Sequence, residues 1–175
     1  LQNVASLLMR LELRGIDLGD HWHILAEVCA GRTDDHANPF SSAHDMMVLA
    51  ATGQFQAAEQ LLNNIRDYAS SAANTPGGSL ATAYNAAGIA LCEAMLAPRR
   101  GEHDRVVALI SPVRHDLALI GGSRAQRDIF YQVLVDSAHR AGRGDLIPLY
   151  LDDVRRLGFG IVEQRTLYRD MAGHG

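Results

Sequence analysis

The stretch from Ser42 to Tyr68 constrains the fold most strongly, because it holds two segments whose apolar residues recur with helical spacing. The apolar residues of the first segment are Ala43, Met46, Met47 and Ala50, and those of the second are Phe55, Ala58, Leu61, Leu62, Ile65 and Tyr68. Residues three or four positions apart share one face of an α-helix. Gly53, between the segments, can adopt the left-handed conformation that ends a helix. The stretch therefore predicts a hairpin of two helices.

The same succession of striped segments and glycine-containing turns continues along the 175-residue chain. Gly53, Gly101 and Gly144 mark the turns, and no run of alternating apolar and polar residues predicts a β-strand. One hairpin cannot cover its own apolar stripes, so neighbouring hairpins must stack on it. We therefore predict a single all-α domain of helical hairpins that form a short curved solenoid. The predicted helix pairs span about residues 3–31, 42–69, 79–119 and 123–157, and a terminal helix spans about residues 161–171.

Polar residues at the predicted helix starts match the preferences of N-caps. Asp20, Ser42 and Ser123 each have a side-chain oxygen that can accept a hydrogen bond from a free backbone N–H group. Ser42 with Asp45, and Ser123 with Gln126, also have the spacing of a capping box. We therefore expect these side chains to stabilise helix ends.

The composition limits the partners and the compartment. The chain has 16 basic and 20 acidic residues and a net charge of −4, which argues against a nucleic-acid partner. Cys29 and Cys92 lie far apart within apolar stripes, so we expect buried free thiols and a reducing cytoplasm. No apolar run approaches the roughly 18 residues of a membrane span, so no membrane contact is predicted.

Two segments bear on the extent of the domain. The run at 70–78 is rich in Ser, Gly and Pro and predicts a flexible connection. A predicted helix starts almost at Leu1, which suggests that the chain is a piece of a longer protein.

Three runs of residues resemble a known family. They are Arg10–Gly15, Asp35-His36 followed by Phe40 and Ala43-His44, and Ile120–Phe130 with its Gly-Gly-Ser-Arg-Ala-Gln-Arg-Asp string. In these runs the chain resembles the tetratricopeptide repeat protein 38 family, and the similarity extends from about Val4 to Leu157. The resemblance implies the C-terminal part of an intracellular, tetratricopeptide-like helical-repeat protein. It implies no reaction, so no catalytic residues are transferred to this chain.

A loop and the helix that follows it bring Asp35, His36 and His44 close together in the sequence. Their oxygen and imidazole groups, with the guanidinium of Arg127, could line the polar pocket of an enzyme or of a small-molecule-binding protein. The simpler interpretation is that these side chains cap a helix and hold the loop backbone, while Arg127 makes an interhelical salt bridge. Their spacing fits no metal-binding motif, so no metal, no cofactor and no catalytic residue is predicted.

The leading prediction is a module that binds a protein or peptide partner on the inner surface of the solenoid. The polar and aromatic residues expected near that surface are Tyr84, Asn85, Gln126, Arg127 and Tyr131. A third interpretation is a scaffold that forms homo-oligomers by burying an exposed apolar patch against another copy. An enzyme would differ from both, because its polar residues would converge in one closed cavity.

Overall fold

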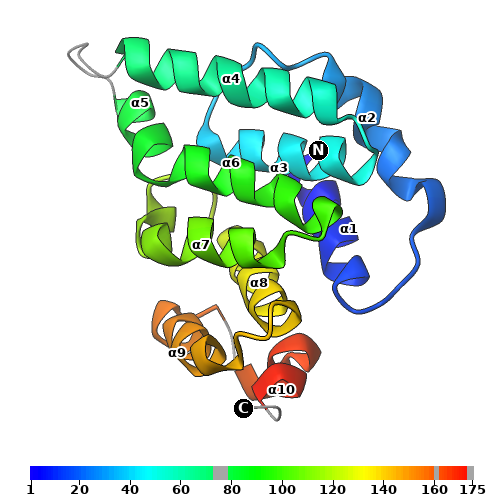
Figure 1. Cartoon of the computed structure of the whole chain (residues 1–175), viewed down its shortest axis with the longest axis vertical. Helices are drawn as coiled ribbons and strands as arrows, with labels where there is room; N and C mark the ends of the chain where they lie inside the picture. Colours follow the sequence, from blue (N-terminus) through cyan, green and yellow to red (C-terminus); the bar gives the residue numbers. More distant parts are fainter. Residues whose placement is uncertain (73–78, 160–161, 173–175) are drawn as a thin grey trace.

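The computed structural model of this chain describes residues 1–72, 79–159 and 162–172, and within these ranges it contains helices and no strands (Figure 1). The α-helices are α1 (Gln2–Glu12), α2 (His23–Ala30), α3 (Pro39–Ala51), α4 (Phe55–Ala72), α5 (Ser79–Ala83), α6 (Ile89–Leu96), α7 (His103–Val113), α8 (Arg124–Arg140), α9 (Ile147–Leu157) and α10 (Thr166–Ala172). Short 3₁₀ turns are η1 (Gly19–Trp22), η3 (Ala97–Arg100), η4 (Asp116–Ala118), η5 (Gly144–Leu146) and η6 (Val162–Gln164). The prediction of an all-α fold is confirmed.

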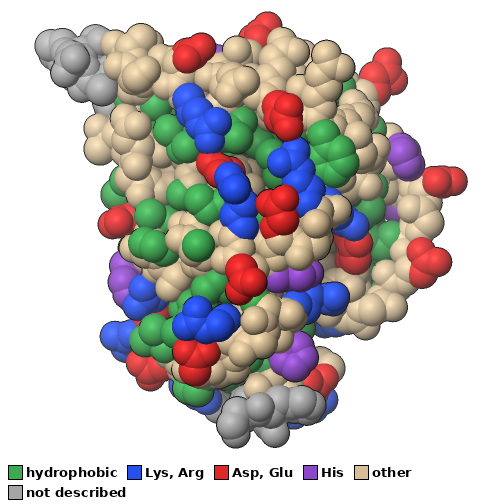
Figure 2. Space-filling model, viewed as in Figure 1, with side chains coloured by type: hydrophobic (Ala, Val, Ile, Leu, Met, Phe, Trp, Pro, Cys, Tyr) green, Lys and Arg blue, Asp and Glu red, His purple; other side chains and the backbone are tan. Residues whose placement is uncertain are grey.

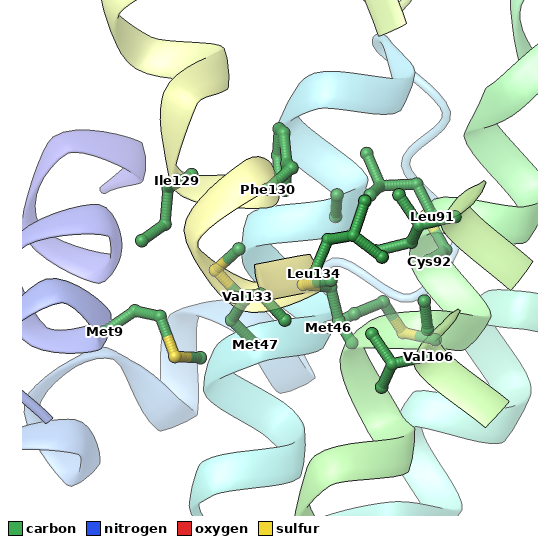
Figure 3. Packing of buried hydrophobic residues seen from close by; sticks show 14 of the residues in the cluster. Met9, Met46, Met47, Leu91, Cys92, Val106, Ile129, Phe130, Val133 and Leu134 are labelled. Atoms are coloured by element: carbon green, nitrogen blue, oxygen red, sulfur yellow. The ribbon is translucent and has the colours of Figure 1, made fainter. Parts of the chain in front are cut away.

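Helix α3 lies at the centre of the molecule, and each of its residues from Pro39 to Ala50 is buried. It packs against α1, α2, α4 and α6, so apolar and small side chains are needed on all of its faces. Figure 3 shows the core that α3 shares with α1, α6, α7 and α8. The labelled side chains in this core are Met9, Met46, Met47, Leu91, Cys92, Val106, Ile129, Phe130, Val133 and Leu134.

The breaks between helices fall where the glycines predicted them. Gly53 and Gly101 adopt φ angles of 71° and 72° and end α3 and η3, in the left-handed region that an L side chain disfavours. In the third turn, it is Gly142, with φ 69°, that takes this conformation, while Gly144 begins η5. The left-handed residue of this turn is therefore two positions earlier than the glycine we singled out.

The predicted cap of α3 is wrong. The helix begins at Pro39, and the side-chain oxygen of Asn38 accepts a hydrogen bond from the Ser41 N–H at 2.8 Å. Proline is tolerated at the first helical position, where its missing N–H is not needed. Ser42 and Asp45 therefore lie inside the helix and form no capping box.

The other two predicted caps have different outcomes. Asp20 caps nothing, because it lies inside η1 and neither η1 nor α2 has a side-chain cap. Ser123 forms the predicted capping box with Gln126: the Gln126 N–H donates to Ser123 Oγ at 3.3 Å, and the Ser123 N–H donates to Gln126 Oε1 at 2.8 Å.

A long helical segment runs from Ser79 to Arg100 through α5, the π-helical turn η2 (Tyr84–Gly88), α6 and η3. A Cβ atom on Gly88 would lie 2.7 Å from Pro39 Cβ, so only glycine fits where this segment crosses the start of α3. Among the described residues, only this segment is long and apolar enough to cross a membrane, which differs from our expectation. Its most apolar window is 61% buried, so packing against α3, α4 and α7 accounts for its composition.

Two predicted boundaries reach the limits of the described residues. Helix α4 continues to Ala72, so Ser70 and Ser71 are helical, and the rest of the predicted connection, residues 73–78, lies outside the described residues. At the C-terminus, residue 161 also lies outside them, and the expected terminal helix consists of η6 followed by α10.

Most helices pack on their neighbours in the sequence, from α3 and α4 through α6, α7 and α8 to α9. Other contacts depart from this order: α3 packs against α6, α8 packs against α10, and α1 packs against α8 as well as α3. Arg10 Nη2 donates to the Ala125 carbonyl at 3.3 Å and lies 3.9 Å from Asp128 Oδ2. Helix α1 therefore closes the array on the side where α3 and α8 approach each other, a contact that a linear stack of hairpins does not have.

Candidate functional site

The predicted polar pocket of Asp35, His36, His44 and Arg127 is not assembled. Asp35 is held within its own loop: Oδ2 accepts from Arg32 Nη2 at 2.7 Å, and Oδ1 accepts from the Ala37 N–H at 2.9 Å. The hydrogen bond from Arg32 lowers the pKa of Asp35. This carboxylate holds the loop backbone, as the simpler interpretation predicted.

The two histidines lie in separate environments. His44 is fully buried, with Nδ1 at 2.7 Å from the Phe40 carbonyl and Nε2 at 2.8 Å from Ser6 Oγ. Because a carbonyl only accepts, Nδ1 carries the proton and Nε2 accepts from the serine. Burial lowers the pKa of His44 to about 4, so the ring is neutral and structural. The His36 ring packs on Tyr68 with centroids 4.9 Å apart, in a shallow hollow on another part of the surface.

Tyr84 and Asn85 do not line an inner groove. Tyr84 is fully buried, and its hydroxyl lies 2.8 Å from Ser42 Oγ. Asn85 is exposed, and its side-chain amide donates to the Ala69 carbonyl at 3.3 Å, which ties η2 to α4. Both side chains hold helices together.

Gln126 and Tyr131 are also engaged within the fold. Besides its place in the capping box, Gln126 donates from Nε2 to Asn3 Oδ1 at 3.0 Å, which joins α8 to α1. Tyr131 is fully buried, and its hydroxyl donates to the Arg114 carbonyl at 3.0 Å. Burial raises the pKa of Tyr131 to about 12. Its ring nevertheless forms part of the floor of a surface pocket.

Arg127 does not make the predicted interhelical salt bridge. Its Nη1 donates to the carbonyls of Gly121, at 3.2 Å, and Gly122, in the turn before α8. No carboxylate of the described chain lies within 4.0 Å of it. Partial burial, followed by the nearby charge of Arg124, lowers the pKa of Arg127. The guanidinium is therefore positioned by backbone carbonyls, and its charge is not neutralised.

Arg127 and Tyr131 line a pocket of about 250 Å³ between η4, α8 and α9, which we call the arginine pocket. The other lining residues are Arg114, His115, Leu117, Ala118, Arg124, Arg156, Leu157 and Phe159. The sequence reasoning missed Arg114, Arg124 and Arg156 as members of one site. The double arginine before Leu157 was visible in the sequence, but its position beside α8 depends on the packing of α9.

Two of the four arginines are neutralised within the pocket wall. Buried Asp153 accepts from Arg114 Nε at 2.8 Å and, through its other oxygen, from Arg156. Arg156 Nε also lies 3.1 Å from Asp152. These ion pairs attach α9 to the end of α7.

The other two arginines have no such partner in the described ranges. Arg124, in the first turn of α8, is exposed, and its Nη1 would lie 3.2 Å from a Cβ placed on Gly158. Gly158 is the C-cap of α9, where the helix dipole is negative and attracts a cation. Arg124 and Arg127 therefore present two positive charges at the rim of the pocket.

The floor of the arginine pocket is apolar. Leu117 and Phe159 are buried there, and the rings of Phe159 and Tyr131 lie 5.3 Å apart. An apolar floor under a cationic rim can hold an anionic group that is attached to an apolar body, because arginine binds carboxylates and phosphates through planar paired donors.

A second charged pocket, of about 290 Å³, lies between α4, α6, η3 and α7 and has a different character. Figure 2 shows basic and acidic side chains interleaved on this face of the molecule. Arg66 donates to Glu93 at 2.6 Å and Arg100 donates to Glu59 at 2.8 Å, while Arg105 contacts the second oxygen of Glu93. These charges neutralise one another and join the helices, so we assign this pocket a structural role.

No group of three His, Cys, Asp or Glu side chains in residues 1–72, 79–159 and 162–172 could hold a metal ion. No protein-family model matches the sequence, and no solved structure matches the chain.

Proposed function

We propose that this chain is a tetratricopeptide-like helical-hairpin module that binds an acidic segment of a partner protein in the arginine pocket. One observation supports the proposal: Arg124 and Arg127 line this pocket, and neither has a carboxylate partner within the described residues. The leading prediction from the sequence, an interaction module, is kept. The binding surface that we propose is the arginine pocket between η4, α8 and α9, instead of the inner face of the solenoid that the sequence predicted.

Charge favours an acidic peptide over a nucleic acid. The chain as a whole carries −4, and two free arginines are too few for the extended basic face that phosphate backbones require. Partial burial lowers the pKa of Arg127, and repulsion from the positive charge of Arg124 lowers it further. A bound carboxylate between the two would remove this repulsion, so the pocket is selective for anions.

Size favours a peptide side chain over a larger ligand. A volume of about 250 Å³ is below the roughly 300–1,000 Å³ of most small-molecule sites. Leu117 and Phe159 would contact an apolar residue next to the carboxylate. The favoured ligand is therefore an extended segment in which acidic and apolar residues are adjacent.

The proposed compartment is the reducing cytoplasm, which the buried free thiols of Cys29 and Cys92 support. A short curved solenoid is supported by the sequential packing of α3, α6, α7 and α8, although α1 closes one side of the array. The family resemblance seen in the sequence stays a prediction. An enzyme is not proposed, because Asp35, His36 and His44 are engaged in separate structural contacts.

Fluorescence anisotropy with a labelled hexaglutamate peptide tests the proposal at low ionic strength. Arg124→Gln should weaken binding about tenfold, which corresponds to one charge-assisted hydrogen bond. Arg105→Gln is the matched control, because it removes the same charge from the second charged pocket, where Arg105 is paired with Glu93. Equal losses in the two variants would show that binding is non-specific, and absence of binding to the wild-type chain would refute the proposal.

A further inference from the structure

The exposed large apolar side chains fall into two groups. One group belongs to the first 28 residues and comprises Val4, Leu7, Ile16, Ile24 and Val28. The other group comprises Leu119, Leu149 and Leu157. Single exposed apolar residues are ordinary, but a group on one face of a protein often marks an interaction surface.

In the first group, Ile24 and Val28 lie one turn apart on α2 and are 73% and 53% exposed. Ile24 shares a shallow hollow of about 580 Å³ with Asp17 and Asp20. Glu27, also exposed, is three residues after Ile24 and therefore on the same side of the helix. We call Asp20, Ile24, Glu27 and Val28 the α2 face: it is apolar at its centre and acidic at its edges.

The second group borders the arginine pocket. Leu157 lines it, and Leu119 follows η4, two of whose residues form part of its wall. Leu149 is seven residues before Arg156, so the two project from the same side of α9. The pocket is therefore a cationic surface with apolar side chains around it.

These two surfaces are complementary in charge, and both present apolar side chains. They cannot meet within one molecule, because α2 lies at the right-hand edge of Figure 1 and α9 lies at its lower left. We infer that the acidic partner of the arginine pocket is the α2 face of a second copy of this chain. This inference rests on the proposed function, since it names the partner for the same pocket.

The geometry of such a contact has a consequence for assembly. Two different surfaces meet, so a pair of copies keeps one free α2 face, on the first copy, and one free arginine pocket, on the second. Head-to-tail contacts of this kind lead to rings or open chains rather than closed two-fold dimers. The mass should therefore increase progressively with concentration and decrease with added salt, because the rim contacts are ionic.

Sedimentation velocity over a concentration series, with two charge-reversal variants, tests the inference. One variant carries Asp20→Arg and Glu27→Arg, and the other carries Arg124→Glu; all three positions are exposed, so we expect both variants to fold. Each variant alone should dissociate at least about tenfold more readily than the wild type. An equimolar mixture should associate again, because the unaltered pocket of the first variant meets the unaltered α2 face of the second. The basic face of the first variant can also meet the acidic, altered pocket of the second.

Three outcomes would overturn the inference. One is a wild-type chain that stays monomeric at every concentration, another is a mixture that does not recover association, and the third is association that excess hexaglutamate peptide fails to compete away. Binding of hexaglutamate to the same chain shows whether self-association alone has failed or the proposed function has failed as well. A monomeric chain that still binds hexaglutamate through Arg124 would refute self-association alone, whereas loss of both would refute the two proposals together.

Discussion

Replacing Gly122 by alanine tests how the turn before α8 packs on the core. Gly122 has a φ of 71°, and a Cβ atom there would lie 2.7 Å from both Cδ2 and Cε2 of the Phe40 ring. Phe40 is 6% exposed, and its ring centroid lies 4.4 Å from that of His44 and 6.2 Å from that of Phe130. The ring therefore has little space into which it can move.

Gly53 supplies a matched control, because its φ is also 71° but nothing lies within 4 Å of an added Cβ. Gly53→Ala should cost about 1 kcal/mol, the penalty for a left-handed L residue. Gly122→Ala should add about 1–3 kcal/mol of overpacking, for a total of about 2–4 kcal/mol. The effect of alanine on the unfolded chain is common to both variants and cancels in the comparison.

Urea unfolding followed by circular dichroism gives the two free energies by linear extrapolation. Adding Phe40→Leu to Gly122→Ala should recover part of the loss, since a smaller side chain would leave room for the new methyl group. If the two alanine variants unfold within about 0.5 kcal/mol of each other, the packing of Gly122 against Phe40 does not restrict this turn, and the reasoning is wrong.

Three further predictions concern buried polar groups. The Asp128 carboxylate accepts a hydrogen bond from the Tyr168 hydroxyl at 2.9 Å. Asp128→Asn should lower the free energy of unfolding by about 2–4 kcal/mol in the same urea titration, and an unchanged midpoint would contradict this. Burial lowers the pKa of His44 from 6.5 to about 4, so as the pH falls the unfolded chain takes up a proton first. The stability from this group is complete above pH 6.5 and should fall by up to about 3 kcal/mol as the pH approaches 4, a loss absent from His44→Gln. Burial also raises the pKa of Cys29 to about 12, so its thiol should react with an aromatic disulfide reagent only after unfolding, and rapid reaction of the folded chain would disprove its burial.

The local part of the fold could be predicted from the sequence, because helical spacing and turn glycines act over a few residues. The stripe from Ala43 to Ala50 and the left-handed Gly53 are examples. The cap of α3 was missed because we assigned that role to Ser42 and overlooked Asn38-Pro39. The pair fits equally well an N-cap followed by proline at the first helical position, which is the arrangement found.

The long-range part could not be predicted, because it depends on which surfaces meet. Arg10 reaches Ala125 across more than a hundred residues, and nothing in the spacing of α1 indicates this. The site shows the same limit. The simpler prediction for Arg127, an interhelical salt bridge, was wrong, because the sequence could not show that Asp153 would pair with Arg114 and that Arg127 would bond to the backbone carbonyls of the turn before α8.

The central claim is that the arginine pocket binds acidic segments, and an NMR titration of the isotope-labelled chain with hexaglutamate tests it most directly. We predict that the largest shift changes occur at the Arg124 and Arg127 guanidinium groups and at the backbone amide of Phe159, all of which line the pocket. Changes centred instead on Arg66 and Arg100, or no change at saturating peptide, would contradict the claim.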